Sequence, residues 1–346
     1  MKSYMKQLEI GLDLPADSVV LPSKGKIYDQ ESFFYRRGVV EYKPMTPRQE
    51  EILMNSAYRK KNNTVDQLIS SCLMESNVDI SHLLVGDKNA LMVAIRISGY
   101  GREYEPSIPC PGCEVQNDLH LDLSAINMKI LKLEPEMPGM NLFKYKLPKS
   151  GHDVFFKFLT VADERDMSQR ESTKINEFNT VTTLLQYSIV KINNIVDRNK
   201  IDSFIQSMNA SDSNHLRKYI NRHCPGLEMH FDFSCTECSH VDRINLPSDH
   251  SFFSLSHEHR EIVFLEPFFL LGYYFGMDYQ TYCNFPVSYR RWLVERIDKE
   301  IRASSKANEN GASNTVSKGA HHNSPDARAM SGKQRAVVPA GLRRFT

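Results

Sequence analysis

Two Cys-x-x-Cys pairs are the residues of this sequence best suited to chemistry. Cys110 and Cys113 stand in IPCPGC, and Cys235 and Cys238 stand in FSCTEC. Two thiolates on a tight turn point to one side, and Zn²⁺ prefers four such ligands arranged as a tetrahedron. We therefore predict one structural Zn²⁺ shared by the four cysteines. A site closed by four thiolates keeps no position for water or substrate, which argues against metal catalysis.

Other interpretations of the pairs stay open. A thioredoxin-like redox site needs its pair at a helix start, where the helix dipole lowers a thiol pKa, whereas strand-like segments flank both pairs here. An iron–sulfur cluster also takes four cysteines, although two separate hairpins suit zinc better. The two pairs could also lie apart without metal, and His240 could replace one thiol as a ligand.

The distance between the pairs is explained by an internal repeat. When Cys110 is aligned with Cys235, upstream segments align in the same order: LPSKG at 21–25 with LPKSG at 147–151, YKPMTPRQEE at 42–51 with FKFLTVADER at 156–165, and NTVDQLISSCLM at 63–74 with NTVTTLLQYSIV at 179–190. We therefore predict a tandem duplication over about 19–124 and 145–248, as a pair of similar units and not a solenoid. The zinc would pin the two repeats together.

Each repeat is expected to contain the same elements. A strand-like segment leads into Thr46 or Thr160, whose hydroxyl suits a helix N-cap, and acidic residues follow in the first turn. Further helices are expected at 64–75 and 87–98 in the first copy, and at 180–194 and 212–223 in the second. Alternating segments around each pair predict a β-hairpin. The fold class is α+β, a tandem duplication of a helical unit with a cysteine-knuckle β-hairpin.

The chain divides into a first repeat at 1–130, a second at 131–250, aromatic C-terminal helices at 251–306 and a flexible tail at 307–346. IVFLEPFFLLGYYFG at 262–276 reads as a buried helix too short to span a bilayer. With a connector and a second helix after Pro286 it would form a helical hairpin. This hairpin either completes the core of the repeats or binds a partner through an aromatic surface: Phe268, Tyr273, Tyr274 and Trp292.

The tail is poor in apolar residues, so we expect it to be disordered in isolation. Its last residues, AVVPAGLRRFT, are apolar and basic. This pattern suits a segment that becomes ordered on a partner, through contacts from Leu342, Arg343, Arg344 and Phe345. An idle tail is the alternative.

Composition and motifs exclude several functions. The 346 residues include 43 Lys and Arg and 42 Asp and Glu, so the net charge is close to zero. The protein as a whole is therefore not attracted electrostatically to nucleic acid or to a membrane. The N-terminus lacks the apolar stretch of a signal peptide. We find no nucleophile motif, phosphate loop or dinucleotide fingerprint. We therefore predict a protein that is not an enzyme and has no small-molecule substrate.

The sequence resembles the T4-type phage baseplate hub proteins. The segments that carry the resemblance are LPSKGKIY, VEYKPMTPRQEEIL, VDQLISSCL and GDKNALMVAIRISGYGREYEPSIPCPGC. The resemblance covers about 1–305 and implies a structural or chaperone-like assembly protein of a contractile-tail baseplate hub. Its partners would be other hub or tail proteins, in the host cytoplasm during assembly or in the virion.

The alternative is a zinc-ribbon nucleic-acid-binding regulatory protein. Phosphate contacts need several basic residues, however, and Lys and Arg are not concentrated around either cysteine pair.

Overall fold

The computed structural model describes residues 16–60, 63–75, 78–173, 180–255 and 260–310. It contains both helices and strands, as an α+β class requires. The described residues form two compact units: unit 1 contains those of 16–260 and Cys283–Tyr289, and unit 2 contains Glu261–Tyr282 and 290–310. None of the described helices combines the length and the apolar character that crossing a membrane would require.

The first half of unit 1 is a short sheet covered by helices. β1 (Asp17–Val20) pairs antiparallel with β2 (Val39–Tyr42). Then follow α1 (Pro47–Met54), α2 (Ser56–Lys60), α3 (Thr64–Cys72) and α4 (Val85–Tyr100). α1 begins where expected, because Thr46 is its N-cap, Pro47 suits the first helical position, and the Thr46 N–H donates to Gln49 Oε1 at 2.9 Å. Leu53, Leu68 and Leu91 lie in the core between these helices.

The second half of unit 1 has a three-stranded sheet in the order β10-β9-β8. Its strands are β8 (Phe143–Lys146), β9 (Asp153–Phe156) and β10 (Ile189–Ile192), and its helices are α5 (Val161–Thr173), α6 (Thr180–Ser188), α7 (Arg198–Ser207) and α8 (Ala210–His223). Phe143, Phe156 and Phe158 pack together in its core. A two-stranded ladder of β7 (Met128–Lys129) and β11 (Gly226–Leu227) connects this half to the linker that precedes it.

One predicted helix in this half was wrong in part. We expected a helix over 180–194, but α6 ends at Ser188 and β10 begins at Ile189. The residues of β10 are rich in β-branched side chains, which pack well in a sheet. Pairing with β9 therefore decides the conformation of this short apolar run.

Aligned positions of the two halves make the same backbone contacts. Lys43 N–H donates to Cys72 O at 2.7 Å, and Lys157 N–H donates to Ser188 O at 2.8 Å. In each half this bond ties the residues before the first helix to the end of a later helix.

A buried aspartate provides a second matched contact. Asp87 in α4 accepts the Ser23 N–H on Oδ1 at 2.9 Å, and Asp212 in α8 accepts the Lys149 N–H on Oδ1 at 2.9 Å. Both aspartates lie in the first turn of their helix, and both are almost fully buried. Each fixes a loop of the aligned LPSKG and LPKSG segments against its helix.

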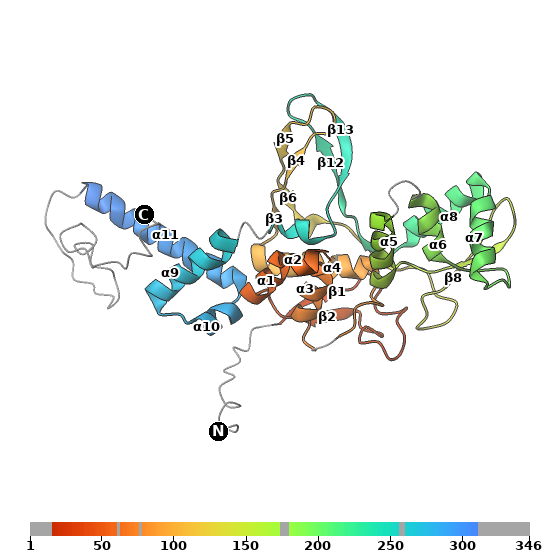
Figure 1. The fold of residues 1–346 in the computed structure, drawn as a ribbon, viewed down its shortest axis with the longest axis horizontal. Helices are drawn as coiled ribbons and strands as arrows, with labels where there is room; N and C mark the ends of the chain where they lie inside the picture. The colour runs from red at the N-terminus through yellow and green to blue at the C-terminus, as the bar shows by residue number, and fades with distance from the viewer. Residues whose placement is uncertain (1–15, 61–62, 76–77, 174–179, 256–259, 311–346) are drawn as a thin grey trace, which may run out of the picture. The chain divides into compact units, whose positions relative to one another are not determined.

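Two β-hairpins stand side by side and project from the helical part of unit 1 (Figure 1). The first hairpin is formed by β4 (Ser107–Pro109) and β5 (Gln116–Asp118) on a base of β3 (Glu103–Tyr104) and β6 (Leu121–Asp122). The second is formed by β12 (His230–Ser234) and β13 (Val241–Asn245). We call residues 103–122 and 230–245 together the hairpin arm.

Short 3-10 turns follow each hairpin, η1 (Leu123–Ala125) and η2 (His250–Phe253). Unit 2 and its continuation consist of the π-helical η4 (Glu261–Leu265), α9 (Glu266–Phe275), α10 (Tyr279–Asn284) and α11 (Val287–Asn310). In unit 2, Phe264 and Tyr282 are buried and pack edge to face at 5.2 Å between ring centroids.

Three expectations for this region were wrong. The segment 262–276 is not a buried helix, because Ile262, Phe269 and Tyr273 are 63%, 68% and 55% exposed. The expected connector contains α10. The backbone of α11 also continues through 307–310, which we had assigned to the tail. Residues 311–346 lie outside the described residues.

Candidate metal centre

Each cysteine pair occupies the turn of its hairpin, and the two turns have the same backbone conformation. Cys110 N–H donates to Val115 O at 2.9 Å, and Cys235 N–H donates to His240 O at 2.9 Å. The residue after each second cysteine has a positive φ, 60° at Glu114 and 55° at Ser239. This left-handed residue reverses the chain while both thiols stay on one side of the turn.

The four sulfur atoms converge between the hairpins. Cys110 Sγ lies 3.6 Å from Cys238 Sγ, and Cys113 Sγ lies 3.6 Å from Cys235 Sγ. All four sulfur atoms lie within 4.8 Å of one another. Tetrahedral Zn²⁺ with bonds of about 2.3 Å holds its ligand sulfurs about 3.8 Å apart. The cluster therefore fits a single zinc ion held by both hairpins.

Apolar side chains pack around the cysteine cluster. Cys110, Cys235 and Phe233 are buried together, with Leu119 and Ile244 packed against them. These two residues occupy aligned positions after the cysteines of their hairpins, so each hairpin contributes one aliphatic side chain. The apolar layer excludes water from the inner side of the sulfur atoms.

Asn117 joins one hairpin to the other. Its Oδ1 accepts the Thr236 N–H at 3.0 Å, and its Nδ2 lies 3.7 Å from Cys235 Sγ. Asn117 is buried, and the sequence pattern did not indicate this role. An amide donor beside a metal-bound thiolate stabilises its negative charge.

The thiols differ in acidity when no cation neutralises them. The Cys238 N–H, followed by the Glu237 N–H, lowers the pKa of Cys235 to about 6. The Val115 N–H lowers the pKa of Cys113, but the neighbouring thiols outweigh it and raise this pKa to about 12. Crowded thiols oppose a second negative charge, whereas a bound cation favours all four thiolates.

His240 is not one of the cluster's members. Its ring instead lies against Gly112. A Cβ atom, if Gly112 had one, would lie 3.3 Å from His240 Cγ. Strands precede and follow both pairs, so neither pair has the helix start of a thioredoxin-like site. Four sulfur ligands suit a structural ion with no open position for a substrate.

The predicted partner-binding aromatic residues lie in unit 2 with different exposures. Tyr273 and Trp292 are 55% and 64% exposed. Phe268 and Tyr274 are half-buried, and the Phe268 ring packs against Tyr282 at 5.3 Å between centroids. Phe269 is not among the predicted partner-binding residues, but it is the most exposed aromatic residue among those described in α9. Its ring stacks on that of Tyr273, with 6.4 Å between the centroids.

Leu342, Arg343, Arg344 and Phe345 lie outside the described residues, so their predicted contacts stay a prediction.

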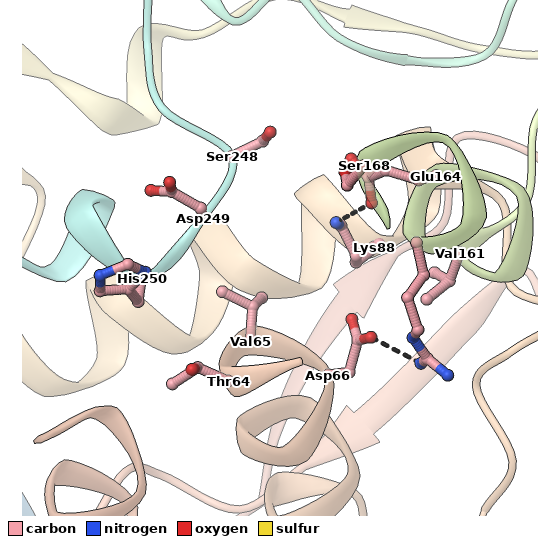
Figure 2. A pocket seen from close by; sticks show the side chains of 11 residues that line it. Thr64, Val65, Asp66, Lys88, Val161, Glu164, Ser168, Ser248, Asp249 and His250 are labelled. Carbon is pink, nitrogen blue, oxygen red and sulfur yellow. Dashed lines mark hydrogen bonds and ion pairs between the residues drawn. The ribbon is translucent and has the colours of Figure 1, made fainter. Parts of the chain in front are cut away.

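A polar cavity of about 210 Å³ is another place in unit 1 where ionisable groups gather. Figure 2 shows the ion pair between Lys88 and Glu164. A second ion pair joins Asp66 to Arg165 at 2.7 Å. Lys88 is buried, and each pair joins a helix of the first half to α5 of the second half. The pairs therefore couple the two halves of unit 1.

Ser248, Asp249 and His250 also line this cavity, a composition that could suggest nucleophilic catalysis. Among the described residues, however, His250 makes no hydrogen bond to Ser248 or Ser168, and Asp249 instead accepts the Ser251 N–H at 2.9 Å. A serine nucleophile needs a base within hydrogen-bond reach. The described geometry does not assemble such a pair.

Comparison with known families gives one match. A family model described as T4 bacteriophage base plate protein matches residues 15–254. This span contains both halves of unit 1 and all four clustered cysteines. No curated protein and no solved structure matches the chain.

Proposed function

Because this chain belongs to the T4 bacteriophage base plate protein family, which is a family of structural phage proteins, we propose that it builds the hub of a contractile-tail baseplate. It acts without catalysis, as a hub subunit or as a chaperone-like assembly protein. The family match over residues 15–254 carries this proposal. The partners would be other hub or tail proteins, met in the host cytoplasm during assembly or in the virion baseplate.

The metal part of the proposal is one structural Zn²⁺ held by the four cysteines. It is supported by sulfur atoms that all lie within 4.8 Å of one another and by the lack of a fifth position for a substrate. The ion would fix the two hairpins as one arm. A rigid arm loses little conformational entropy when it docks, which suits a component of a large assembly.

The proposed duplication explains why the ligands come from hairpins so far apart in the chain. It is supported by the paired contacts of Lys43 and Lys157, and by those of Asp87 and Asp212. The similar positive φ angles at Glu114 and Ser239 add to it. In this proposal each repeat contributes half of the metal site. The bridge between Tyr42 and Leu73 in the first repeat aligns with the pairing of Phe156 and Ile189 in the second, so the elaborations of the second repeat are α7 and the continuation of β10 beyond Ile189.

The proposed partner surface includes the exposed aromatic residues of unit 2. Ile262, Leu265, Phe269 and Tyr273 recur at helical spacing along η4 and α9, and all four are at least 44% exposed. A continuous apolar stripe on a helix is typical of a protein contact. The segment 336–346 would add apolar and basic contacts.

The charge of the hairpin arm opposes the nucleic-acid alternative. Arg243 is the only Lys or Arg in the arm. The exposed carboxylates of the arm are Glu103, Glu105, Glu114, Asp118, Asp122, Asp232, Glu237 and Asp242. Four zinc-bound thiolates would add further negative charge. Phosphates would be repelled from this surface.

Mass spectrometry of phage particles and of assembly intermediates tests the role. Expressed during infection with an affinity tag, the protein should copurify with baseplate hub or tail proteins. Its presence in complete particles would make it a subunit, and its presence in intermediates alone would make it an assembly factor. Copurification with nucleic acid and no tail proteins would contradict the proposal.

A further inference from the structure

A groove of about 940 Å³ opens on unit 1 and shares no lining residue with the cysteine cluster or with the cavity in Figure 2. Its walls come from the loop after β1, from the segment before α4, from the loop before β8 and from the start of α5. Its volume is enough for several side chains of an extended segment.

The groove has an apolar component. Ile27, Phe33, Val78 and Met140 line it. Phe33 and Val78 are half-buried, and Met140 is 40% exposed. Covering these side chains would remove apolar surface from water, which favours binding of a segment with its own apolar side chains.

The groove is also acidic, and part of this charge is not compensated. Among the described residues, Lys157 is the only Lys or Arg that lines the groove, and it contacts Asp163 at 2.7 Å. Asp29, Glu31 and Asp79 also line the groove, and they form no ion pair with any described residue. Asp29 and Asp79 accept backbone N–H groups of Glu31 and Ser81, at 3.0 and 2.9 Å. Three exposed carboxylates therefore face the groove without a direct ion pair, although the charges of His82 and Arg165 act on Asp79.

Residues 336–346 have the complementary chemistry. AVVPAGLRRFT contains the apolar residues Val337, Val338, Leu342 and Phe345, two adjacent arginines and no acidic residue. Guanidinium groups pair well with carboxylates, in two parallel hydrogen bonds where geometry allows. Pro339 restricts the backbone of this segment and so lowers the entropy lost on binding.

We propose that residues 336–346 bind in this groove, with Arg343 and Arg344 on its carboxylates and the apolar residues on Phe33, Val78 and Met140. The segment comes from the same chain, to which residues 311–335 tether it, so its effective concentration at the groove is high. This inference goes beyond the baseplate role, because it depends on the groove and the segment alone. Proteins that assemble with this chain would then compete for the segment or for the groove.

Photo-crosslinking in the full-length chain tests the proposal. The variant Phe345→p-benzoylphenylalanine, irradiated and digested, should give crosslinks to residues 27–33, 78–82 or 139–141. The same probe at Val316, outside the segment, is the matched control and should not mark the groove. A crosslinked monomer indicates binding within one chain, and a crosslinked dimer indicates binding by a second copy.

Charge variants make the test specific. Glu31→Gln with Asp79→Asn should lower the crosslink yield about fivefold, and so should added salt, because two exposed ion pairs are lost or screened. Asp232→Asn, an exposed carboxylate on the hairpin arm, should leave the yield unchanged. Crosslinks elsewhere in the chain would overturn the proposal. A crosslink yield that stays the same in the Glu31→Gln/Asp79→Asn variant would also overturn it.

Discussion

Cys110 and Cys238 place their sulfur atoms 3.6 Å apart, although they belong to different hairpins on different halves of unit 1. Cys113 and Cys235 have the same separation, 3.6 Å. Each close contact therefore crosses from one hairpin to the other. A metal bound there crosslinks the two hairpins and does not merely close one turn.

Purified protein should contain one zinc ion per chain. Native mass spectrometry should show this ion in the wild type and its loss in the Cys110→Ser/Cys235→Ser variant. Because binding a structural zinc contributes directly to folding free energy, we expect the variant to lose several kcal/mol of stability. Cys224→Ser, which changes a cysteine outside the cluster, should keep the zinc. Two zinc ions per chain would contradict a shared site.

Asp87 and Asp212 should respond to pH with opposite signs. Burial raises the pKa of Asp87 above its ordinary 3.8, more than the hydrogen bonds from Ser23 and Tyr28 lower it. As the pH rises above 3.8, the unfolded carboxyl ionises first, so the wild type should lose stability relative to Asp87→Asn until the folded pKa is passed.

Asp212→Asn is the matched comparison. Burial also acts to raise the pKa of Asp212, but the N–H groups of Lys149 and Ser150 outweigh it and leave the pKa below 3.8. The stability that Asp212 contributes should be present above 3.8 and be lost as the pH falls through the folded pKa. Urea unfolding of the wild type and both variants between pH 3 and 7 measures these slopes. If the free energy of unfolding of the two variants, relative to the wild type, changed with pH in the same direction, the opposite pKa shifts of Asp87 and Asp212 would be refuted.

A methyl group at Gly86 should separate the two halves of unit 1. A Cβ there would lie 2.0 Å from Pro225 O and 2.8 Å from Gly226 Cα, so α4 and β11 would have to move apart. We expect Gly86→Ala to lower the free energy of unfolding by about 1–3 kcal/mol. In Gly38→Ala the nearest atom would be 3.9 Å away, and this control should be close to neutral. Equal stability of both variants would show that α4 and β11 can move apart at Gly86 without a loss of stability.

The sequence predicts best those features that depend on a few local residues. Thr46 and Pro47 mark the start of α1, and the spacing of the four cysteines indicates a common cluster. β10 was missed because a short apolar run fits a helix or a strand, and pairing with β9 decides between them. The role of Asn117 depends on how two hairpins meet, which no local pattern encodes.

The sequence also did not predict which face of a helix is exposed to solvent. The segment 262–276 is apolar on most sides, so its composition indicated burial. In unit 2, Phe264 and Leu271 face the core while Phe269 and Tyr273 stay exposed. Only the positions of the neighbouring helices determine which side is covered.

Deleting residues 336–346 should separate folding from assembly. The segment lies outside the cysteine cluster, so zinc content should stay at the wild-type value. Thermal stability should change little, because a groove-bound segment adds only a few exposed contacts. The yield of complete baseplates in a phage complementation assay should fall, because the deletion removes Leu342, Arg343, Arg344 and Phe345 as proposed contacts. The matched variant Phe269→Ser/Tyr273→Ser changes only exposed side chains of α9 and should also keep zinc and stability. Full infectivity of the deletion with a defect in the α9 variant would assign the partner contact to the aromatic stripe. The opposite result would assign it to the segment 336–346, and full infectivity of both would remove both surfaces from the proposed assembly role.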